Sequence, residues 1–108
     1  MAEYTAPHIT TPTFALQSAY DAWQLPNVLA VTCGFDVKDC SPAQKAAFLG
    51  FRDKMLAKMA AALAVPTFGL WMDSCVLHGQ QDVHGDWDAI KINGVTARKA
   101  FGDWYANL

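Results

Sequence analysis

One stretch decides the predicted fold: Thr67-Phe-Gly-Leu-Trp-Met-Asp-Ser-Cys-Val-Leu-His78-Gly-Gln80. Five of its first six residues are apolar or glycine, which favours a buried strand over residues 67–72, and polar residues then lead to a histidine. A buried strand that ends in a loop carrying a histidine is a common way to place a catalytic base at the edge of a sheet. The neighbouring segments must show whether His78 has partners for such a role.

Short apolar segments precede this stretch. Residues 13–17 fit a strand, so Asp21 is expected just past a strand end. Leu25-Pro26-Asn27 is predicted to block any helix at that point, and residues 28–31 fit a further short strand or a turn. The segment from Cys33 to Cys40 has the composition of a loop.

The clearest local signal is a helix start. Ser41 is an N-cap, Pro42 suits the first helical position, and Gln44 can close a capping box. The helix is predicted to reach about Ala64 and to stop before Pro66. Its expected apolar arc consists of Phe48, Leu49, Phe51, Met55, Leu56, Met59 and Leu63.

One charged residue, Arg52, falls inside that arc. Either its stem packs on apolar surface while the head reaches water, or it pairs with a buried carboxylate.

The segments after residue 80 complete the pattern. Residues 81–88 are polar, residues 90–92 fit a short extended piece, and Asn93 or Gly94 is expected to open a last helix. The apolar face of that helix is Ala97, Ala100, Phe101, Trp104 and Tyr105. Strands that alternate with helices predict the α/β class, with short parallel strands and two main helices.

Composition excludes several classes. The 108 residues suit one domain, 53% of them are hydrophobic and the net charge is −2, with no basic patch that would bind nucleic acid. No apolar run is long enough to span a membrane, and the first residues lack the features of a signal peptide. Three cysteines leave two alternatives open: a Cys33–Cys40 disulfide, or three free thiols in a reducing compartment.

Asp21 and His78 form the first candidate constellation. Each follows a predicted strand, and the carboxyl ends of parallel strands meet at one edge of a sheet, where α/β enzymes place their sites. An aspartate that orients a histidine is half of an acyl-transfer triad, and the order Asp then His matches that of α/β hydrolases. On spacing alone, a lone Asp and a lone His are more often structural.

The nucleophile is the difficulty, since the sequence contains no Gly-x-Ser-x-Gly elbow. Ser41 serves as a helix cap, and neither Ser18 nor Ser74 lies on a glycine-flanked turn. Cys75 lies three residues before His78 and would make a Cys–His pair.

A metal site is the second candidate. It would use Cys75, His78, Asp82 and His84. Their spacing matches no zinc pattern, so we predict no metal and no other cofactor.

Several segments, taken in order, resemble the pectin acetylesterases. They are Tyr20-Asp21-Ala22-Trp23-Gln24, the block from Cys33 through Cys40-Ser41-Pro42 to Gly50-Phe51-Arg52, Ser74-Cys75-Val-Leu-His78-Gly-Gln80, Trp87, and Gly102-Asp103-Trp104-Tyr105. The resemblance covers residues 11–105, and the animal Notum carboxylesterases are more distant relatives. It implies an α/β-hydrolase-like fold and a secreted, metal-independent cell-wall enzyme that removes acetyl groups from pectin with a Ser-His-Asp triad.

By this resemblance, Asp21 is the triad acid and His78 the base, and Trp23 and Gln24 are candidates for shaping the substrate site, with a core position as the alternative for Trp23. The family's nucleophilic serine and oxyanion-hole glycines lie in its N-terminal half. Residues 1–108 are therefore expected to form a single partial domain, the C-terminal part of such an esterase, inactive without the missing half.

The resemblance also bears on the cysteines and on Arg52. Gly79 stands where many family members have cysteine, which favours the Cys33–Cys40 bridge and leaves Cys75 without a partner. Arg52 recurs in the family block, which favours a specific partner for it. The alternative to an esterase fragment is a small non-catalytic α/β module that binds a partner through an apolar face.

Overall fold

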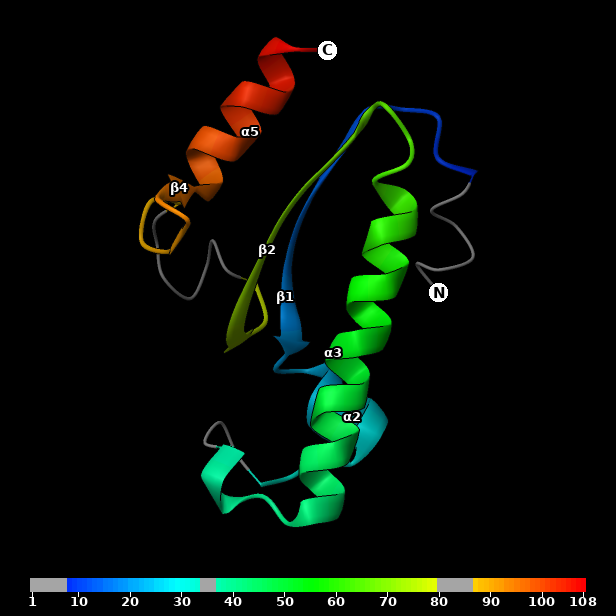
Figure 1. The fold of residues 1–108 in the computed structure, drawn as a ribbon, viewed down its shortest axis with the longest axis vertical. Coiled ribbons are helices and arrows are strands. Elements are labelled where there is room, and N and C mark those ends of the chain that lie inside the picture. Colours follow the sequence, from blue (N-terminus) through cyan, green and yellow to red (C-terminus); the bar gives the residue numbers. More distant parts are fainter. Residues whose placement is uncertain (1–7, 34–36, 80–86) are drawn as a thin grey trace.

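Two parallel strands lie between two helices in the computed structural model, which describes residues 8–33, 37–79 and 87–108. Strand β1 (Thr13–Asp21) pairs with β2 (Phe68–Leu77). Helix α3 (Pro42–Ala62) lies against one face of the pair, and α5 (Ala97–Ala106) contacts the other (Figure 1). The parallel strands and covering helices confirm the α/β class, and β2 continues five residues beyond the predicted end of its strand.

The start of α3 confirms the predicted capping box. The Ser41 hydroxyl accepts a hydrogen bond from the Gln44 N–H, and the Gln44 side chain accepts one from the Ser41 N–H. The helix ends at Ala62, close to the predicted end. The capping box thereby satisfies the N–H groups of Ser41 and Gln44, which have no partner inside the helix.

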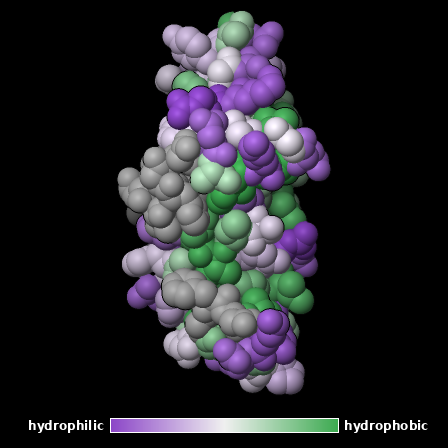
Figure 2. Space-filling model, turned by 90° about the vertical axis from the view of Figure 1, so that its left-hand side faces the viewer, coloured by the Kyte–Doolittle hydropathy of each residue, from purple (hydrophilic) through white to green (hydrophobic). Residues whose placement is uncertain are grey.

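The predicted apolar arc of α3 is wrong in its extent. Within this fully described helix only Phe48 is buried, whereas Leu49 is 52% exposed and Leu63, at its C-cap, is 50% exposed. A sheet of two described strands is too narrow to cover a helix of 21 residues along its whole apolar side. Apolar side chains of α3 therefore reach the surface. Figure 2 shows that hydrophobic residues also form a band on the face of the molecule that it views.

Two predictions between residues 24 and 31 are also wrong. Helix α2 (Gln24–Leu29) forms where Pro26 was expected to block a helix, and it includes Val28 and Leu29 rather than leaving them in a strand or turn. Pro26 is the third residue of α2, where the backbone N–H that proline lacks has no partner within the helix.

The last helix begins later than predicted. Asn93 and Gly94 have φ values of 51° and 80° and connect β3 (Lys91–Ile92) to the antiparallel β4 (Val95–Thr96). Left-handed conformations at both central residues are typical of a tight hairpin turn, which is why Asn-Gly occurs there. Helix α5 then starts at Ala97, and the Thr96 hydroxyl accepts a hydrogen bond from the Lys99 N–H.

The core lies at the carboxyl end of the strands. Leu25 of α2, Val31 and Phe48 of α3 form the buried cluster, and the ring of Tyr20 stacks on Phe48 with centroids 4.4 Å apart. Partly buried side chains around this cluster include Val76 of β2. The core therefore supports the ends of both strands, where Asp21 and His78 lie.

The loop that follows α2 is closed by a disulfide. Cys33 and Cys40 are bonded, with Cα atoms 4.9 Å apart, and the 3₁₀ turn η2 (Val37–Asp39) lies between them. Cys75 is a free thiol on β2. No helix in the described part of the chain has the length and apolar character needed to cross a membrane.

Gly69 of β2 lies where α5 approaches the sheet. Phe14 of β1 packs against Phe101 and Trp104 of α5, with ring centroids 5.4 and 5.3 Å away. A Cβ atom at Gly69 would collide with the Phe14 ring and lie 2.6 Å from Trp104 Cδ1.

We expect Gly69→Ala to lower the free energy of unfolding by about 1–3 kcal/mol, because two packed rings would have to move. The matched control is Gly102→Ala in α5, where an added Cβ meets nothing within 4 Å. That change is expected to stabilise the helix by up to about 1 kcal/mol. Urea unfolding of the two variants would measure the contrast, and equal effects would contradict the packing described for Gly69.

Candidate active site

Asp21 and His78 lie together at the carboxyl edge of the sheet. Asp21 is the last residue of β1 and pairs with Leu77, the last residue of β2, so that His78 follows directly. His78 Nδ1 lies 3.0 Å from Asp21 Oδ2 and 3.1 Å from Asp21 Oδ1. The Asp21 side chain is 7% exposed and that of His78 is 60% exposed, so a buried carboxylate supports an accessible imidazole.

The start of α2 fixes the carboxylate of Asp21. Its Oδ1 accepts hydrogen bonds from the backbone N–H groups of Trp23 (2.9 Å) and Gln24 (2.8 Å). These N–H groups stand at the beginning of the helix, where no helical carbonyl can satisfy them. The same side chain therefore starts α2 and faces His78.

This contact decides which nitrogen of neutral His78 carries the proton. An ionised carboxylate only accepts hydrogen bonds, so Nδ1–H is the donor to Asp21. The second ring nitrogen, Nε2, is then left with its lone pair. That is the tautomer in which a histidine can take a proton from a nucleophile.

Electrostatics favours the ionised form of Asp21. Burial alone would raise its pKa, but hydrogen bonds from His78 and from the Gln24 and Trp23 N–H groups, with the charge on His78, together lower the pKa below the ordinary 3.8. A lowered pKa in the folded state means that ionised Asp21 contributes to stability above pH 3.8, and that this contribution is lost as the pH falls through the lowered value.

We therefore expect Asp21→Asn to weaken the pH dependence of stability in acid. The wild-type chain should lose free energy of unfolding as the pH falls below 3.8, whereas the variant has no titrating group at this position. Urea midpoints measured at several pH values for both chains would test this. Parallel pH profiles for the two chains would contradict the pKa direction.

The two proposed substrate-site residues occupy different positions. Trp23 is 54% exposed, which excludes a core role, and its ring centroid lies 6.4 Å from that of His78. Gln24 is the first residue of α2, and its N–H is the group bonded to Asp21. Trp23 can therefore form one wall beside the imidazole, while Gln24 acts here through its backbone.

The structure gives none of the three serines a position suited to attack with His78. Ser18 is 2% exposed, donates to the Cys75 carbonyl and accepts from the Tyr20 N–H, while Ser41 caps α3. Ser74 is exposed but lies four residues before His78, which is about 13 Å along an extended strand.

Cys75 is also unsuited to attack. It lies on β2, three residues before His78, or about 10 Å along the strand. Burial raises the pKa of its thiol, and the charge and hydrogen bonding of Asp73 raise it further, so the thiolate is disfavoured.

The candidate metal ligands fall partly within the described residues. Cys75 and His78 belong to the described residues, whereas Asp82 and His84 lie outside them. Over the described ranges, no group of three or more His, Cys, Asp or Glu side chains is arranged to hold a metal ion.

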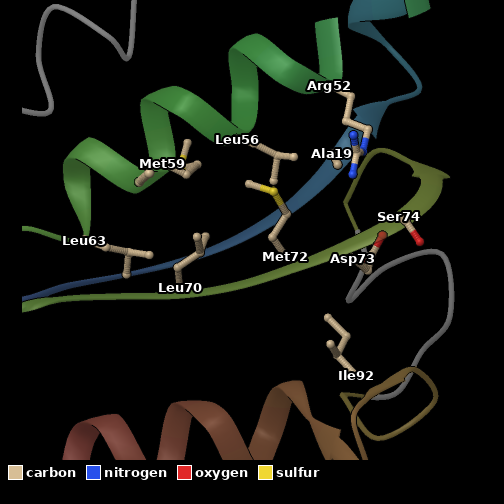
Figure 3. A pocket seen from close by; sticks show the side chains of 11 residues that line it. Ala19, Arg52, Leu56, Met59, Leu63, Leu70, Met72, Asp73, Ser74 and Ile92 are labelled. Carbon is tan, nitrogen blue, oxygen red and sulfur yellow. The ribbon is translucent and has the colours of Figure 1, made fainter. Parts of the chain in front are cut away.

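Arg52 lines a separate groove between α3 and β2. Its Nη1 pairs with Asp53 Oδ1 at 3.1 Å, and Asp53 is exposed, so this is a surface ion pair and not the buried pair that was one of the two alternatives. Figure 3 shows Arg52, Asp73 and Ser74 at one end of the groove. The apolar remainder is lined by Leu56, Met59, Leu63, Leu70 and Met72. Neither Asp21 nor His78 lines this groove.

Sequence reasoning weighed Ser18 only as a nucleophile and did not single out Asp73, yet both are buried polar residues beside the site, 2% and 4% exposed. Each is a polar residue next to apolar residues of its strand, and this was the sequence signal that could have indicated a buried polar position. They lie where the pairing between β1 and β2 changes register.

The fold and the site together define an α/β protein with an aspartate-oriented histidine at the carboxyl edge of a parallel sheet. Comparison with known proteins then gives the family. The pectinacetylesterase family model matches residues 1–108. The chain belongs to the pectinacetylesterase family.

Curated relatives agree with this assignment. Pectin acetylesterase 7 and pectin acetylesterase 11 of Arabidopsis thaliana are 34% and 35% identical over 116 residues, which cover 95% of this chain. Pectin acetylesterase 5 of the same plant is 30% identical over 113 residues. The chain spans about 30% of the length of the first two relatives. No solved structure matched the chain.

Proposed function

We propose that this chain supplies the acid and the base of a Ser-His-Asp triad in a pectin acetylesterase. The observation that carries the proposal is the 3.0 Å contact between His78 Nδ1 and Asp21 Oδ2 at the carboxyl edge of the parallel strands. Family membership supports the reaction class, which is hydrolysis of a carboxylic ester. The substrate follows from the relatives, which are named for pectin acetyl esters.

In the proposed reaction, His78 Nε2 takes the proton from a serine hydroxyl as the serine oxygen attacks the acetyl carbonyl. The same nitrogen then gives the proton to the departing sugar oxygen, which leaves an acetyl-serine. Water repeats the sequence, with His78 again as base, and acetate is released. Asp21 holds the Nδ1–H and stabilises the imidazolium in both halves.

The nucleophilic serine and the donors to the oxyanion belong, in this proposal, to the rest of an α/β-hydrolase-like domain. The positions of Ser18, Ser41 and Ser74 support this view, since none is suited to attack. The chain also spans only about 30% of the length of the first two relatives, which supports the same view. The exposed leucines of α3 and the open groove beside β2 are further support, because more sheet would bury them.

We also propose that the complete enzyme acts outside the cell. Acetylated pectin is an extracellular polysaccharide, and the Cys33–Cys40 disulfide is a bond that persists in oxidising compartments.

A graft tests the proposed function. This chain would replace the matching segment of Arabidopsis thaliana pectin acetylesterase 7, and acetate release from acetylated pectin would be measured, with deacetylated pectin as the control substrate. We expect the graft to release acetate from the acetylated polymer. A graft that melts cooperatively but releases no acetate, beside a parent enzyme that does, would contradict the proposal.

A further inference from the structure

The two strands change register just before the site. Ser18 pairs with Asp73, but Tyr20 pairs with Val76, so two residues of β2 lie opposite the single residue Ala19. This is a β-bulge, an uncommon feature between parallel strands. It lies two residues before the pair Asp21–Leu77.

The bulge determines how far His78 lies from Asp21. If the register of the first half continued, Asp21 would pair with Val76 instead of Leu77. His78 would then lie one residue, or about 3.3 Å, farther along β2. The observed contact of 3.0 Å between the side chains could not form across that added distance without a rearrangement.

Strand β1 is also irregular beside the bulge. Ala19 lines the groove with Arg52 of α3, and the next residue, Tyr20, stacks on Phe48 of the same helix. Successive residues of a regular strand face opposite sides, so β1 departs from regular alternation between these two residues.

Two buried side chains hold the bulge. The Ser18 hydroxyl donates to the Cys75 carbonyl and accepts from the Tyr20 N–H at 2.9 Å, so it links the two strands. Asp73 Oδ1 accepts from the Cys75 N–H at 2.8 Å. These bonds satisfy backbone groups at the point where the hydrogen-bond ladder between the strands is interrupted. They matter because a buried backbone group without a hydrogen-bond partner lowers stability.

We propose that Ser18 and Asp73 are positioning residues that set the register of the Asp21–His78 pair. Their hydrogen bonds at the bulge go to the backbone of Tyr20 and Cys75, so they act through the strand ends. This proposal rests on the proposed function only because it treats Asp21 and His78 as the acid and base of a triad. Its test measures the tautomer of His78 and uses no ester substrate.

The test reads the tautomer of His78 by ¹⁵N NMR of the purified chain, at a pH where the imidazole is neutral. We expect Nδ1–H to be the major form in the wild type. Ser18→Ala should make Nε2–H the major form, as in an exposed histidine without a carboxylate partner. Ser18→Thr keeps the hydroxyl and should keep Nδ1–H, and so should the control Ser74→Ala, whose side chain is exposed within the same bulge.

Hydrogen exchange on the unaltered chain covers the case in which Ser18→Ala does not fold. The amides of Tyr20 and Cys75 should exchange as slowly as the ladder amides of β1, because both are bonded to buried side chains. Rapid exchange at these two amides would overturn the proposal. So would a folded Ser18→Ala chain in which Nδ1–H remains the major form. If the wild-type chain shows Nδ1–H as the major form of His78 but the graft releases no acetate, only the proposed esterase function is contradicted, and the positioning role of the bulge is not.

Discussion

His78→Ala, introduced into the graft of this chain in pectin acetylesterase 7, is expected to lower the turnover rate for acetate release by about 10⁴-fold or more. The magnitude follows from other serine hydrolases, in which loss of the triad histidine alone costs about as much as loss of the whole triad. The structure gives the reason: His78 presents an accessible imidazole whose Nδ1 is held by Asp21 at 3.0 Å.

Asp21→Asn belongs to the same experiment, with an expected loss of about 10⁴-fold. An asparagine keeps an oxygen for the Trp23 and Gln24 N–H groups but removes the charge that fixes the Nδ1–H tautomer. Trp23→Phe serves as the control, because it keeps an aromatic wall near the imidazole and leaves the pair intact. If the graft with His78→Ala released acetate as fast as the graft without it, the assignment of His78 as the base would be wrong.

The second large effect concerns the core beneath the site. We expect Phe48→Ala to lower the free energy of unfolding by about 3–5 kcal/mol, since the side chain is 2% exposed and its loss leaves a cavity. That is a large part of the stability of a domain of this size. The ring of Tyr20 would also lose the surface on which it stacks.

The matched control for Phe48→Ala is its neighbour on the same helix. Leu49 is 52% exposed, so Leu49→Ala is expected to change stability by no more than about 0.5 kcal/mol. Urea unfolding under non-reducing conditions would compare the two variants. A similar loss from both would mean that the core is not centred where we place it.

The parts of the fold that depend on local chemistry could be predicted from the sequence. Ser41, Pro42 and Gln44 specify the start of α3 through atoms within one turn of each other. That Asp21 and His78 lie at the same edge follows from a general property of parallel strands, whose carboxyl ends share an edge.

The rest depends on contacts that sequence patterns do not contain. A proline in the first turn of a helix gives the same signal as a proline that ends one, so α2 was missed. The exposure of Leu49 depends on how many strands lie under α3, which its own periodicity does not reveal. The bulge joins Ser18 to Cys75, 57 residues away, and such a partner is known only once the register is known.

The central claim is that this chain holds the base and the acid of a triad whose nucleophile lies elsewhere in the protein. Hydrolysis of p-nitrophenyl acetate by the purified chain tests it most directly, with the His78→Ala chain measured beside it. The expected result is no saturable turnover by either chain, because a triad without its serine and oxyanion donors retains little activity. Saturable turnover by the wild-type chain that disappears in the His78→Ala chain would contradict the claim, since a serine or cysteine within these residues would then be the nucleophile.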